Sequence, residues 1–261
     1  MKFTQAIVRP PGRNFASGVT SATEGAPDYE IALQQHLRYC EALNLCGLEV
    51  TRLSVDAALP DGTFVEDAGI VTPHGAIVTR PGAPTRAGEI DSVARALGHF
   101  YPDLRNIDAP GAVDGGDICE ADGHFFIGVS ARTNERGAKQ LKLRLESFGY
   151  SASIVDIRAS KTLLHLKTGI AYLGDGVWAI AAAVERELQP LGRFNIRHLI
   201  SVSPAEGYAA NCVRVNDRVL VASGYPGIAE ALDCRGLRPL LLDMSEYRKM
   251  DGGPSCLSLR F

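Results

Sequence analysis

The stretch AIVRPPG at residues 6–12 is nearly repeated as AIVTRPG at residues 76–82. Each copy has the pattern of a short apolar strand that runs into a turn rich in glycine and proline. Similar apolar strands begin near residues 125, 177 and 219. Self-similarity at a spacing of about 50 residues is typical of folds built from repeated modules. We therefore expect a repeat architecture of the α/β class.

A hairpin partner precedes each of the last four of these strands. The turns between the partners contain His74-Gly75, Asp122-Gly123, Asp175-Gly176 and Asn216-Asp217. Such residues suit the tight turns of antiparallel hairpins. Each second strand is followed by a helical pattern, so the predicted unit is strand, turn, strand and helix. A further strand, such as residues 240–242, is expected after some of the helices.

Apolar spacing locates the longer helices. One helical face in the second unit is formed by Ile90, Val93 and Leu97, and the next unit has Leu141, Leu145 and Phe148. A longer helix is predicted between the first two units, with the apolar face Leu33, Leu37 and Cys40. Gly47 is its expected end, and Asp28 near its start suits the positive end of the helix dipole.

The fifth unit is divided between the two ends of the sequence. Residues 257–261 alternate as a strand with no hairpin partner after them, and the strand at Ala6 has no partner before it. We expect these two strands to pair and to close a ring of five modules. Five modules of about 50 residues account for the 261 residues, so residues 1–261 are predicted to form a single domain.

The composition excludes several classes of protein. Hydrophobic residues make up 46% and charged residues 22%, as in ordinary globular proteins. The net charge of -3 gives no bulk attraction to nucleic acid or to anionic membranes. The first residues lack the apolar run of a signal peptide, and no stretch approaches the roughly 18 apolar residues that span a bilayer. A cytoplasmic protein is expected.

The six cysteines are Cys40, Cys46, Cys119, Cys212, Cys234 and Cys256. None forms a C-x-x-C pair or has zinc-finger spacing to histidines, so no metal site is predicted. In a reducing compartment they should be free thiols, and each is by default a small buried hydrophobe. The sequence also lacks the glycine-rich phosphate-binding loops, and no cofactor is predicted.

Polar or reactive residues recur just before the first hairpin strand of the modules. When the modules are overlaid, these equivalent positions are Glu66-Asp67, Asp117, residues 165–168, Asn211 and Cys256. In a closed ring they would face the same central axis. We therefore expect a functional site where the modules converge.

Glu66 and Asp67 are adjacent carboxylates in an otherwise apolar run. One interpretation is a solvated turn before a strand. The other is a carboxylate pair for a cationic ligand, because burying two unpaired carboxylates is costly. A guanidinium group fits such a pair, since a carboxylate can bind it through two parallel hydrogen bonds.

Cys256, His165 and Asp114 together offer the components of covalent catalysis. A lone histidine in an apolar strand is more often a core residue, but a nucleophilic thiol, an acid/base and an orienting carboxylate form a catalytic set. Cys256 follows Gly252, Gly253 and Pro254, so its thiol is expected at a junction between a loop and a strand. Arg86 and Arg132 follow two second strands, either as surface helix starts or as a clamp for a ligand carboxylate.

Six motifs resemble one known family. They are FVED at residues 64–67, TRPGA at 79–83, SARTN at 130–134, LHLK at 164–167, AANC at 209–212 and YRKMDGG at 247–253. In this order they are similar to those of the dimethylarginine dimethylaminohydrolases, over nearly the whole chain. That family belongs to the guanidino-group modifying enzymes, or penteins, so the resemblance implies a five-bladed α/β propeller.

The resemblance implies hydrolysis of Nω-methylated arginines to citrulline and dimethylamine or methylamine, without metal or cofactor. Cys256 would attack the guanidinium carbon, and His165, oriented by Asp114, would protonate the leaving amine and then activate water. Asp67, with Glu66 beside it, would bind the guanidinium nitrogens.

The family's contacts to the amino-acid end of the substrate also carry over. Arg86 and Arg132 match the positions that hold the α-carboxylate. The α-amino group would be bound by Asp61 and the Val19 carbonyl, and the Met250 carbonyl would line the site. The segment from Gly12 to Gly25, rich in small residues, is the expected lid.

Three departures from the family pattern, and one difference from arginine deiminases, bear on the substrate. Asp114 stands where some relatives have glutamate, Pro254 lies in the nucleophile loop, and Val19 replaces a usual leucine. Lys167 stands where arginine deiminases have a second aspartate, which favours a site with room for methyl groups. An enzyme acting on arginine or another guanidine remains an alternative. A non-catalytic binding protein of the same fold is another, and a homodimer is a further prediction.

Overall fold

A computed structural model describes residues 2–185 and 196–261. In these residues the strands form five separate sheets of three strands each. In spatial order the sheets are β15(Leu259–Arg260)-β1(Gln5–Val8)-β2(Glu49–Arg52), β3(Gly69–Thr72)-β4(Gly75–Val78)-β5(Leu104–Asn106), β6(Ile118–Ala121)-β7(His124–Val129)-β8(Ser151–Asp156), β9(Ile170–Tyr172)-β10(Val177–Ala181)-β11(His198–Val202) and β12(Val213–Val215)-β13(Arg218–Ala222)-β14(Pro239–Leu242).

Every sheet has the same pairing pattern. The middle strand is antiparallel to one neighbour and parallel to the other. The predicted strand at residues 240–242 is confirmed as part of β14, and all five modules have such a third strand rather than only some. The outer strands β2 and β5 are hard to recognise, since they are short and only partly buried. Without a fully buried face they lack a clear apolar alternation.

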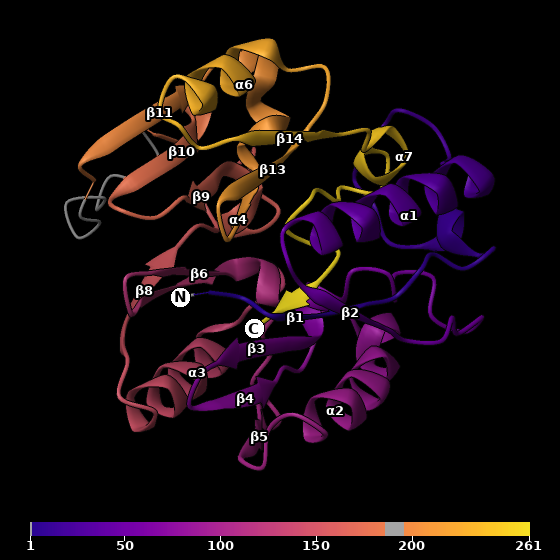
Figure 1. The fold of residues 1–261 in the computed structure, drawn as a ribbon. Helices are drawn as coiled ribbons and strands as arrows, with labels where there is room; N and C mark the ends of the chain where they lie inside the picture. Colours follow the sequence, from indigo (N-terminus) through magenta and orange to yellow (C-terminus); the bar gives the residue numbers. More distant parts are fainter. Residues whose placement is uncertain (1, 186–195) are drawn as a thin grey trace.

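Helices make the crossovers between the parallel strands, as parallel pairing requires. They are α1(Tyr29–Leu45), α2(Ile90–Gly98), α3(Glu135–Ser147), α5(Ala182–Glu185) and α6(Pro226–Asp233). Figure 1 shows α1, α2, α3 and α6 toward the periphery of the molecule. The predicted apolar faces of α2 and α3 are confirmed, with Val93, Leu97, Leu141 and Leu145 buried. The short helices α4(Leu166–Gly169) and α7(Ser245–Arg248) lie elsewhere in the modules.

Helix α1 differs from its prediction in two ways. It lies inside the first module, between β1 and β2, rather than between two modules. Its buried face is formed by Ala32, His36, Tyr39, Cys40 and Leu43, whereas Leu33 and Leu37 are only half-buried. The helix turns Tyr39 inward, because the Tyr39 hydroxyl donates to the Pro254 carbonyl at 2.8 Å. Asp28 is a true N-cap, whose carboxylate accepts from the Ile31 amide at 3.0 Å.

The predicted hairpin turns are confirmed. Asp122, Asp175 and Asn216 have positive φ angles of 50°, 55° and 56°. Asn and Asp tolerate this left-handed conformation better than other residues with a Cβ.

The ring closes where the two ends of the chain meet, as predicted. Strand β1 pairs antiparallel with β15, through Ala6 opposite Arg260 and Ile7 opposite Leu259. Strand β15 is shorter than expected, at two residues. Asn216 joins the fifth sheet to this seam, since its side chain bonds both the amide and the carbonyl of Phe3, at 2.8 and 3.0 Å. Figure 1 shows β1, β15 and β3 side by side near both termini.

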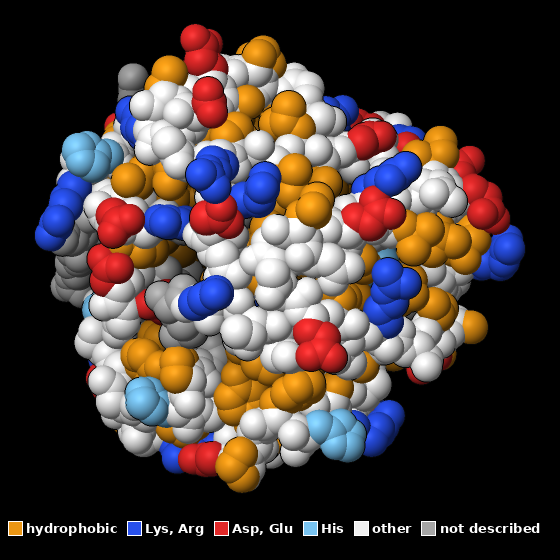
Figure 2. Space-filling model, in the orientation of Figure 1, with side chains coloured by type: hydrophobic (Ala, Val, Ile, Leu, Met, Phe, Trp, Pro, Cys, Tyr) orange, Lys and Arg blue, Asp and Glu red, His pale blue; other side chains and the backbone are white. Residues whose placement is uncertain are grey.

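The surface seen in this orientation carries both signs of charge. Figure 2 shows Lys and Arg interspersed with Asp and Glu, without an extended field of one sign on this face. Among residues 2–185 and 196–261, no helix has both the length and the apolar character needed to cross a bilayer.

Candidate active site

The turns that precede the first strands meet at the centre of the ring. Hydrogen bonds connect them from module to module. The Gly116 amide donates to Asp67 Oδ1 at 2.8 Å, and the Leu166 amide donates to Asp117 Oδ1 at 3.1 Å. The Glu66 amide donates to the Cys256 carbonyl at 3.2 Å. The predicted convergence of these equivalent positions is therefore confirmed.

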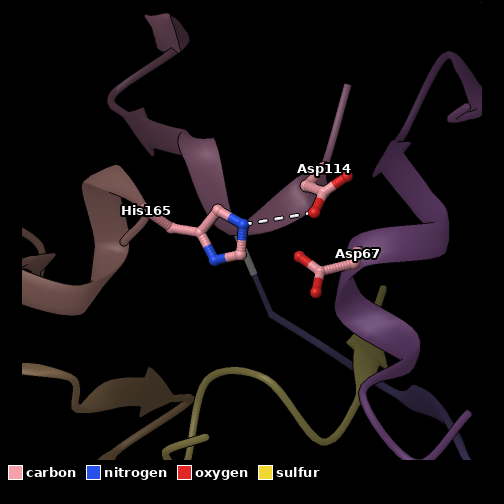
Figure 3. A group of neighbouring side chains, drawn as sticks. All are labelled: Asp67, Asp114 and His165. Carbon is pink, nitrogen blue, oxygen red and sulfur yellow. Dashed lines mark hydrogen bonds and ion pairs between the residues drawn. The ribbon is translucent and has the colours of Figure 1, made fainter. Parts of the chain in front are cut away.

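His165 is fixed by carboxylates from neighbouring modules. Its Nε2 lies 3.2 Å from Asp114 Oδ2, while Asp114 Oδ1 accepts from the Gly82 amide at 2.8 Å. Figure 3 shows Nδ1 directed away from Asp114, with the Asp67 carboxylate beside the ring. Gly116 packs under the imidazole so closely that a Cβ there would lie 2.8 Å from Nδ1. The backbone at Gly116 thus leaves the ring little freedom to turn.

The surroundings of His165 favour its protonated form. Burial alone would lower the pKa of this imidazole, but the carboxylates of Asp67, Asp117 and Asp114 outweigh it and raise the pKa to about 9. His165 is therefore an imidazolium at neutral pH, which is the form that a general acid requires.

Asp67 is part of a buried ion-pair cluster. Its Oδ2 lies 2.7 Å from Arg86 Nη1, and Arg86 also donates to Glu89 through Nε and Nη2, at 3.0 and 2.8 Å. Burial would raise the pKa of Asp67, but the charges of Arg86 and His165 lower it to about 2. The Asp67 carboxylate is consequently a permanent anion in the site. Arg86 is no surface helix start, because its side chain is 5% exposed.

Two hydrogen-bond donors point toward the Cys256 sulfur. Sγ lies 3.5 Å from the Gly253 amide and 3.6 Å from Asn211 Nδ2, whereas the Ser255 hydroxyl, 3.7 Å from Sγ, donates to Glu66. The Asn211 amide is oriented by the Ser255 amide, which donates to its Oδ1 at 3.3 Å. These donors can stabilise a thiolate. The thiol lies at the predicted junction between a loop and a strand.

Cys256 nevertheless rests as a thiol. Burial, and then the carboxylates of Glu66 and Asp67, raise the pKa of this thiol to about 11. All six cysteines are free, as expected, and Cys256 is half-buried. Cys40, Cys46, Cys119 and Cys212 are buried, so they match the default of an unreactive core thiol, whereas Cys234 is exposed.

Glu66 faces away from its neighbour Asp67. Its carboxylate lies 2.6 Å from Lys167 Nζ and 3.3 Å from Arg260 Nη2, and it accepts from Ser255 Oγ at 3.0 Å. Glu66 and Lys167 also line a cavity of about 650 Å³ whose lining includes neither Cys256 nor His165. The predicted carboxylate pair is therefore divided. Asp67 contacts Arg86, whereas Glu66 contacts Lys167 and Arg260.

The residues predicted for the amino-acid end of a substrate lie together. Both oxygens of Asp61 are 3.1 Å from the Val19 amide. A Cβ at Gly18 would lie 2.3 Å from Asp61 Oδ1 and 3.0 Å from Met250 Cε, so this segment is packed tightly onto both. Burial raises the pKa of Asp61, and the charges of Arg86 and Arg132 oppose that shift. Arg132 is half-buried, while Val19 is exposed.

The predicted lid segment is attached to the nucleophile loop. The Ser21 amide donates to Asp251 Oδ2 at 2.6 Å, and Thr20 Oγ1 donates to the same oxygen at 3.0 Å. Arg248 pairs with Glu24 at 2.8 Å. Asp251 has a positive φ of 59°. Residues 20–24 thus contact the loop that carries Cys256.

Asp67, Asp114 and His165 offer ligand atoms within 4.8 Å of one another. Such a group could hold a metal ion. However, Arg86 already places a cation 2.7 Å from Asp67 and 4.0 Å from Asp114. These three side chains fit proton transfer and guanidinium binding better than metal coordination, because Arg86 already supplies a positive charge beside the carboxylates.

Comparison with known proteins places the chain in a family. A dimethylarginine dimethylaminohydrolase of Pseudomonas aeruginosa is 44% identical over 260 residues, which cover 99% of this chain and 100% of the relative. One from Streptomyces coelicolor is 33% identical over 267 residues, covering 100% of this chain and 98% of the relative. The chain belongs to the dimethylarginine dimethylaminohydrolase family. No protein-family model matches the chain.

Solved structures of the dimethylarginine dimethylaminohydrolase family confirm the fold. The P. aeruginosa enzyme, as a cysteine-to-serine mutant with citrulline, matches with a TM-score of 0.93 at 43% identity over 100% of both chains. A histidine-to-glycine form, as an adduct with S-methyl-L-thiocitrulline, gives 0.92 at 44% identity over 99% of this chain and 100% of that one. The N-terminal domain of ArgZ, a cyanobacterial arginine dihydrolase, shares the fold with 0.89 at 18% identity, covering 100% and 97%. The predicted five-bladed α/β propeller is confirmed.

Three residues of this family member gained significance only from the structure. Asn211 and Asp117 were among the equivalent positions before the first strands, but neither received a role. Glu89 binds Arg86, and its position three residues along a helical turn was the available signal. The sequence alone does not show that Glu89 is buried, because this depends on the burial of its partner Arg86.

Proposed function

We propose that the chain hydrolyses Nω,Nω-dimethyl-L-arginine and Nω-methyl-L-arginine to L-citrulline, with release of dimethylamine or methylamine. Membership of the dimethylarginine dimethylaminohydrolase family over the full chain is the observation that carries this proposal. The arrangement of an imidazolium, a half-buried thiol and an anionic Asp67 around one centre supports it. Residues 1–261 would act as one catalytic domain, without a metal or an organic cofactor.

The first half-reaction forms a covalent intermediate. The cationic guanidinium binds at Asp67 and offsets the carboxylates that oppose ionisation of Cys256, so the thiol releases its proton to water. The thiolate attacks the guanidinium carbon, with Asn211 and the Gly253 amide donating to the sulfur beforehand. His165 then gives its proton to the substituted nitrogen, the C–N bond breaks and the amine leaves. An S-linked thiouronium remains on Cys256.

The second half-reaction restores the enzyme. Neutral His165 takes a proton from water, and the resulting hydroxide attacks the thiouronium carbon. The C–S bond breaks and Cys256 leaves as a thiolate; the hydroxyl proton left on the urea passes through solvent to the thiolate, and neutral citrulline is released. Asp114 would stabilise the imidazolium that forms again. Its role is positional and electrostatic, since it bonds the nitrogen of His165 that does not face the substrate.

Contacts at the other end would select an amino acid. Arg132 and Arg86 would bind the α-carboxylate, Asp61 and the Val19 carbonyl would bind the α-amino group, and the Met250 carbonyl would line the site. Glu66 would act through Ser255 and the Cys256 loop, because Lys167 and Arg260 hold its carboxylate away from Asp67. Lys167 leaves one side of the guanidinium without a second acid, which favours methylated substrates.

Substrate profiling tests the proposal directly. Citrulline formation is measured with dimethylarginine, monomethylarginine, arginine and agmatine, using Cys256→Ser as the blank. The methylated arginines should have the highest kcat/KM. A higher kcat/KM for arginine would replace this function by that of an arginine deiminase, which is the alternative enzyme with the same catalytic set.

Thiol labelling distinguishes an enzyme from a binding protein of the same fold. The test uses a Cys234→Ser background, because Cys234 is exposed and would react on its own account. Cys256 should react first among the remaining cysteines, and faster when a guanidinium ligand is bound. Equal and slow labelling of all five would favour a non-catalytic protein.

A further inference from the structure

The hydrogen-bond partners of Cys256 give a direction to its thiol proton. The Gly253 amide and Asn211 Nδ2 both donate to Sγ, so neither group can accept a proton from it. The sulfur also contacts Ser255 Oγ at 3.7 Å, and the hydroxyl hydrogen of Ser255 is given to Glu66 Oε2 at 3.0 Å. A hydroxyl that donates to one group can still accept from another. The S–H group of Cys256 therefore donates to Ser255 Oγ.

Glu66 presents one of its two oxygens to this serine. Lys167 Nζ and Arg260 Nη2 both contact Oε1, at 2.6 and 3.3 Å, so Oε2 is left to accept from Ser255. Ser255 and Glu66 are both buried, which keeps the two side chains in this arrangement. The Cys256 thiol, the Ser255 hydroxyl and the Glu66 carboxylate thus form a continuous chain of hydrogen bonds.

The far end of this chain borders the cavity of about 650 Å³. Ser255 and Glu66 line the cavity, whereas its lining contains neither the nucleophile nor the catalytic histidine. The lining also includes three exposed acidic residues, Glu120, Asp122 and Asp175. The cavity is therefore open to solvent, and water in it can take a proton from Glu66.

The acids and bases on the catalytic side of Cys256 are already engaged. The carboxylates around His165 raise its pKa to about 9 despite its burial, so this imidazolium cannot take the thiol proton at neutral pH. Arg86 and His165 lower the pKa of Asp67 to about 2 despite its burial, which makes Asp67 a weak base. In the proposed reaction the substrate lies against the exposed side of the half-buried sulfur and excludes water there.

We propose that Ser255 and Glu66 form a proton relay, which carries the thiol proton of Cys256 into this cavity when the substrate binds. The S–H bond breaks as Ser255 Oγ takes the proton, and the original hydroxyl proton of Ser255 passes to Glu66 Oε2. Glu66 then gives a proton to water, the Ser255 hydroxyl turns back to Glu66, and a thiolate remains. The inference rests on the proposed function and specifies how its first half-reaction loses a proton.

Glu66→Gln distinguishes a relay from a purely electrostatic role. Burial, and then the carboxylates of Glu66 and Asp67, raise the pKa of Cys256, so removing the Glu66 charge favours the thiolate. Glutamine still accepts a hydrogen bond from Ser255, but it does not take up a proton at neutral pH. The relay therefore predicts changes of opposite sign: faster alkylation of Cys256 by iodoacetamide in the ligand-free variant, and slower release of dimethylamine from the substrate.

Dimethylamine release is measured in a single turnover by rapid quenching, with the enzyme in excess over Nω,Nω-dimethylarginine. Glu66→Gln and Ser255→Ala should each slow it about tenfold, less than the full contribution of a positioned acid or base, because water still takes the proton slowly. In Ser255→Ala the solvent deuterium isotope effect on this step should increase, because proton transfer then limits it. Ser255→Thr keeps the hydroxyl and should stay within about threefold of the unsubstituted chain.

Ser258→Ala is the matched control. Ser258 is a buried serine that lines the same cavity, but its hydroxyl contacts Tyr39 and Arg260, at 2.6 and 2.7 Å, rather than Ser255. Its loss should lower the melting temperature and leave dimethylamine release within about twofold.

Dimethylamine release by Glu66→Gln that equals or exceeds that of the unsubstituted chain would overturn the relay, since Glu66 would then act by its charge alone. Equal losses in Ser255→Ala and Ser255→Thr would also overturn it, because packing rather than the hydroxyl would be responsible. A thermal unfolding scan confirms that each variant is folded, and if Ser255→Ala is not, the two opposite changes in Glu66→Gln decide. Failure of the proposed function would differ, because the unsubstituted chain would release no dimethylamine.

Discussion

The surroundings of His165 and of Cys256 differ in charge: carboxylates surround the histidine, whereas hydrogen-bond donors face the cysteine. Three carboxylates, Asp67, Asp114 and Asp117, raise the pKa of His165 to about 9. The Cys256 sulfur instead faces hydrogen-bond donors from Asn211 and the Gly253 amide. Burial, and then the carboxylates of Glu66 and Asp67, raise the pKa of Cys256 as well. His165 and Cys256 therefore both rest protonated, and under the proposed function a cationic substrate would promote ionisation of the thiol.

Replacing the nucleophile should have the largest effect. Cys256→Ser is expected to lower kcat about a thousandfold or more, since a hydroxyl is a far weaker nucleophile in this setting. Cys212→Ser is the matched control: it is a buried thiol next to Asn211 in sequence, 3% exposed, and takes no part in the proposed reaction. It should lower the melting temperature but keep kcat within about twofold. Steady-state assays of both variants check this difference.

The acidic half is tested by Asp114→Asn. Loss of this carboxylate should reduce kcat about tenfold to a hundredfold, less than the full contribution of a general acid, because His165 itself is kept. It should also move the alkaline limb of the pH profile to lower pH, because Asp114 is one of the groups that raise the pKa of His165. In the unsubstituted chain the rate should fall above about pH 9. A reduced kcat with an unmoved limb would contradict the assigned electrostatic role.

The donor half is tested by Asn211→Ala. Losing a hydrogen bond to a charged sulfur should lower kcat about tenfold. It should also slow alkylation of Cys256 by iodoacetamide at fixed pH, measured with a guanidinium ligand bound. Asn211→Asp should slow alkylation further, since a carboxylate beside the sulfur opposes the thiolate. If Asn211→Ala alkylates at the original rate, the amide does not stabilise the thiolate.

The smallest effect is on stability. The folded pKa of His165, about 9, lies above its ordinary value of 6.5. Its contribution to folding is therefore fully present below about pH 6.5 and is lost as the pH rises through 9. The free energy of unfolding of the unsubstituted chain, relative to His165→Asn, should fall by about 1–3 kcal/mol between pH 6 and pH 10. Urea denaturation at the two pH values measures it.

The sequence was sufficient for the modules and for their meeting point. Strands such as β7 and β10 are strongly apolar, and the turn residues mark their hairpins, so local physics determines both. The outer strand β5 was missed because its three residues are only partly buried or exposed. Strand β5 forms because α2 returns the chain alongside β4, with which β5 pairs in parallel. This pairing is a property of the whole fold.

The site shows the same division between local and non-local information. The equivalence of module positions predicted that Asp67, His165 and Cys256 would converge. It could not predict that Glu66 and Asp67 would point to different partners, because this depends on Lys167 and Arg86, from distant segments. The assigned substrate contacts, the cytoplasmic location and the homodimer stay predictions.

The seam of the ring has a consequence for how activity is lost. Two residue pairs join β1 to β15, with three more backbone hydrogen bonds between residues 4–5 and Phe261, whereas six pairs join β7 to β8. Regions with few backbone hydrogen bonds open at a lower free energy than the rest of a domain. Cys256 lies three residues before β15, whereas His165 is the N-cap of α4, in the module that contains β9. Local opening of this seam would separate nucleophile from acid in a molecule that still has four intact sheets. Activity should therefore decline in denaturant before circular dichroism detects unfolding.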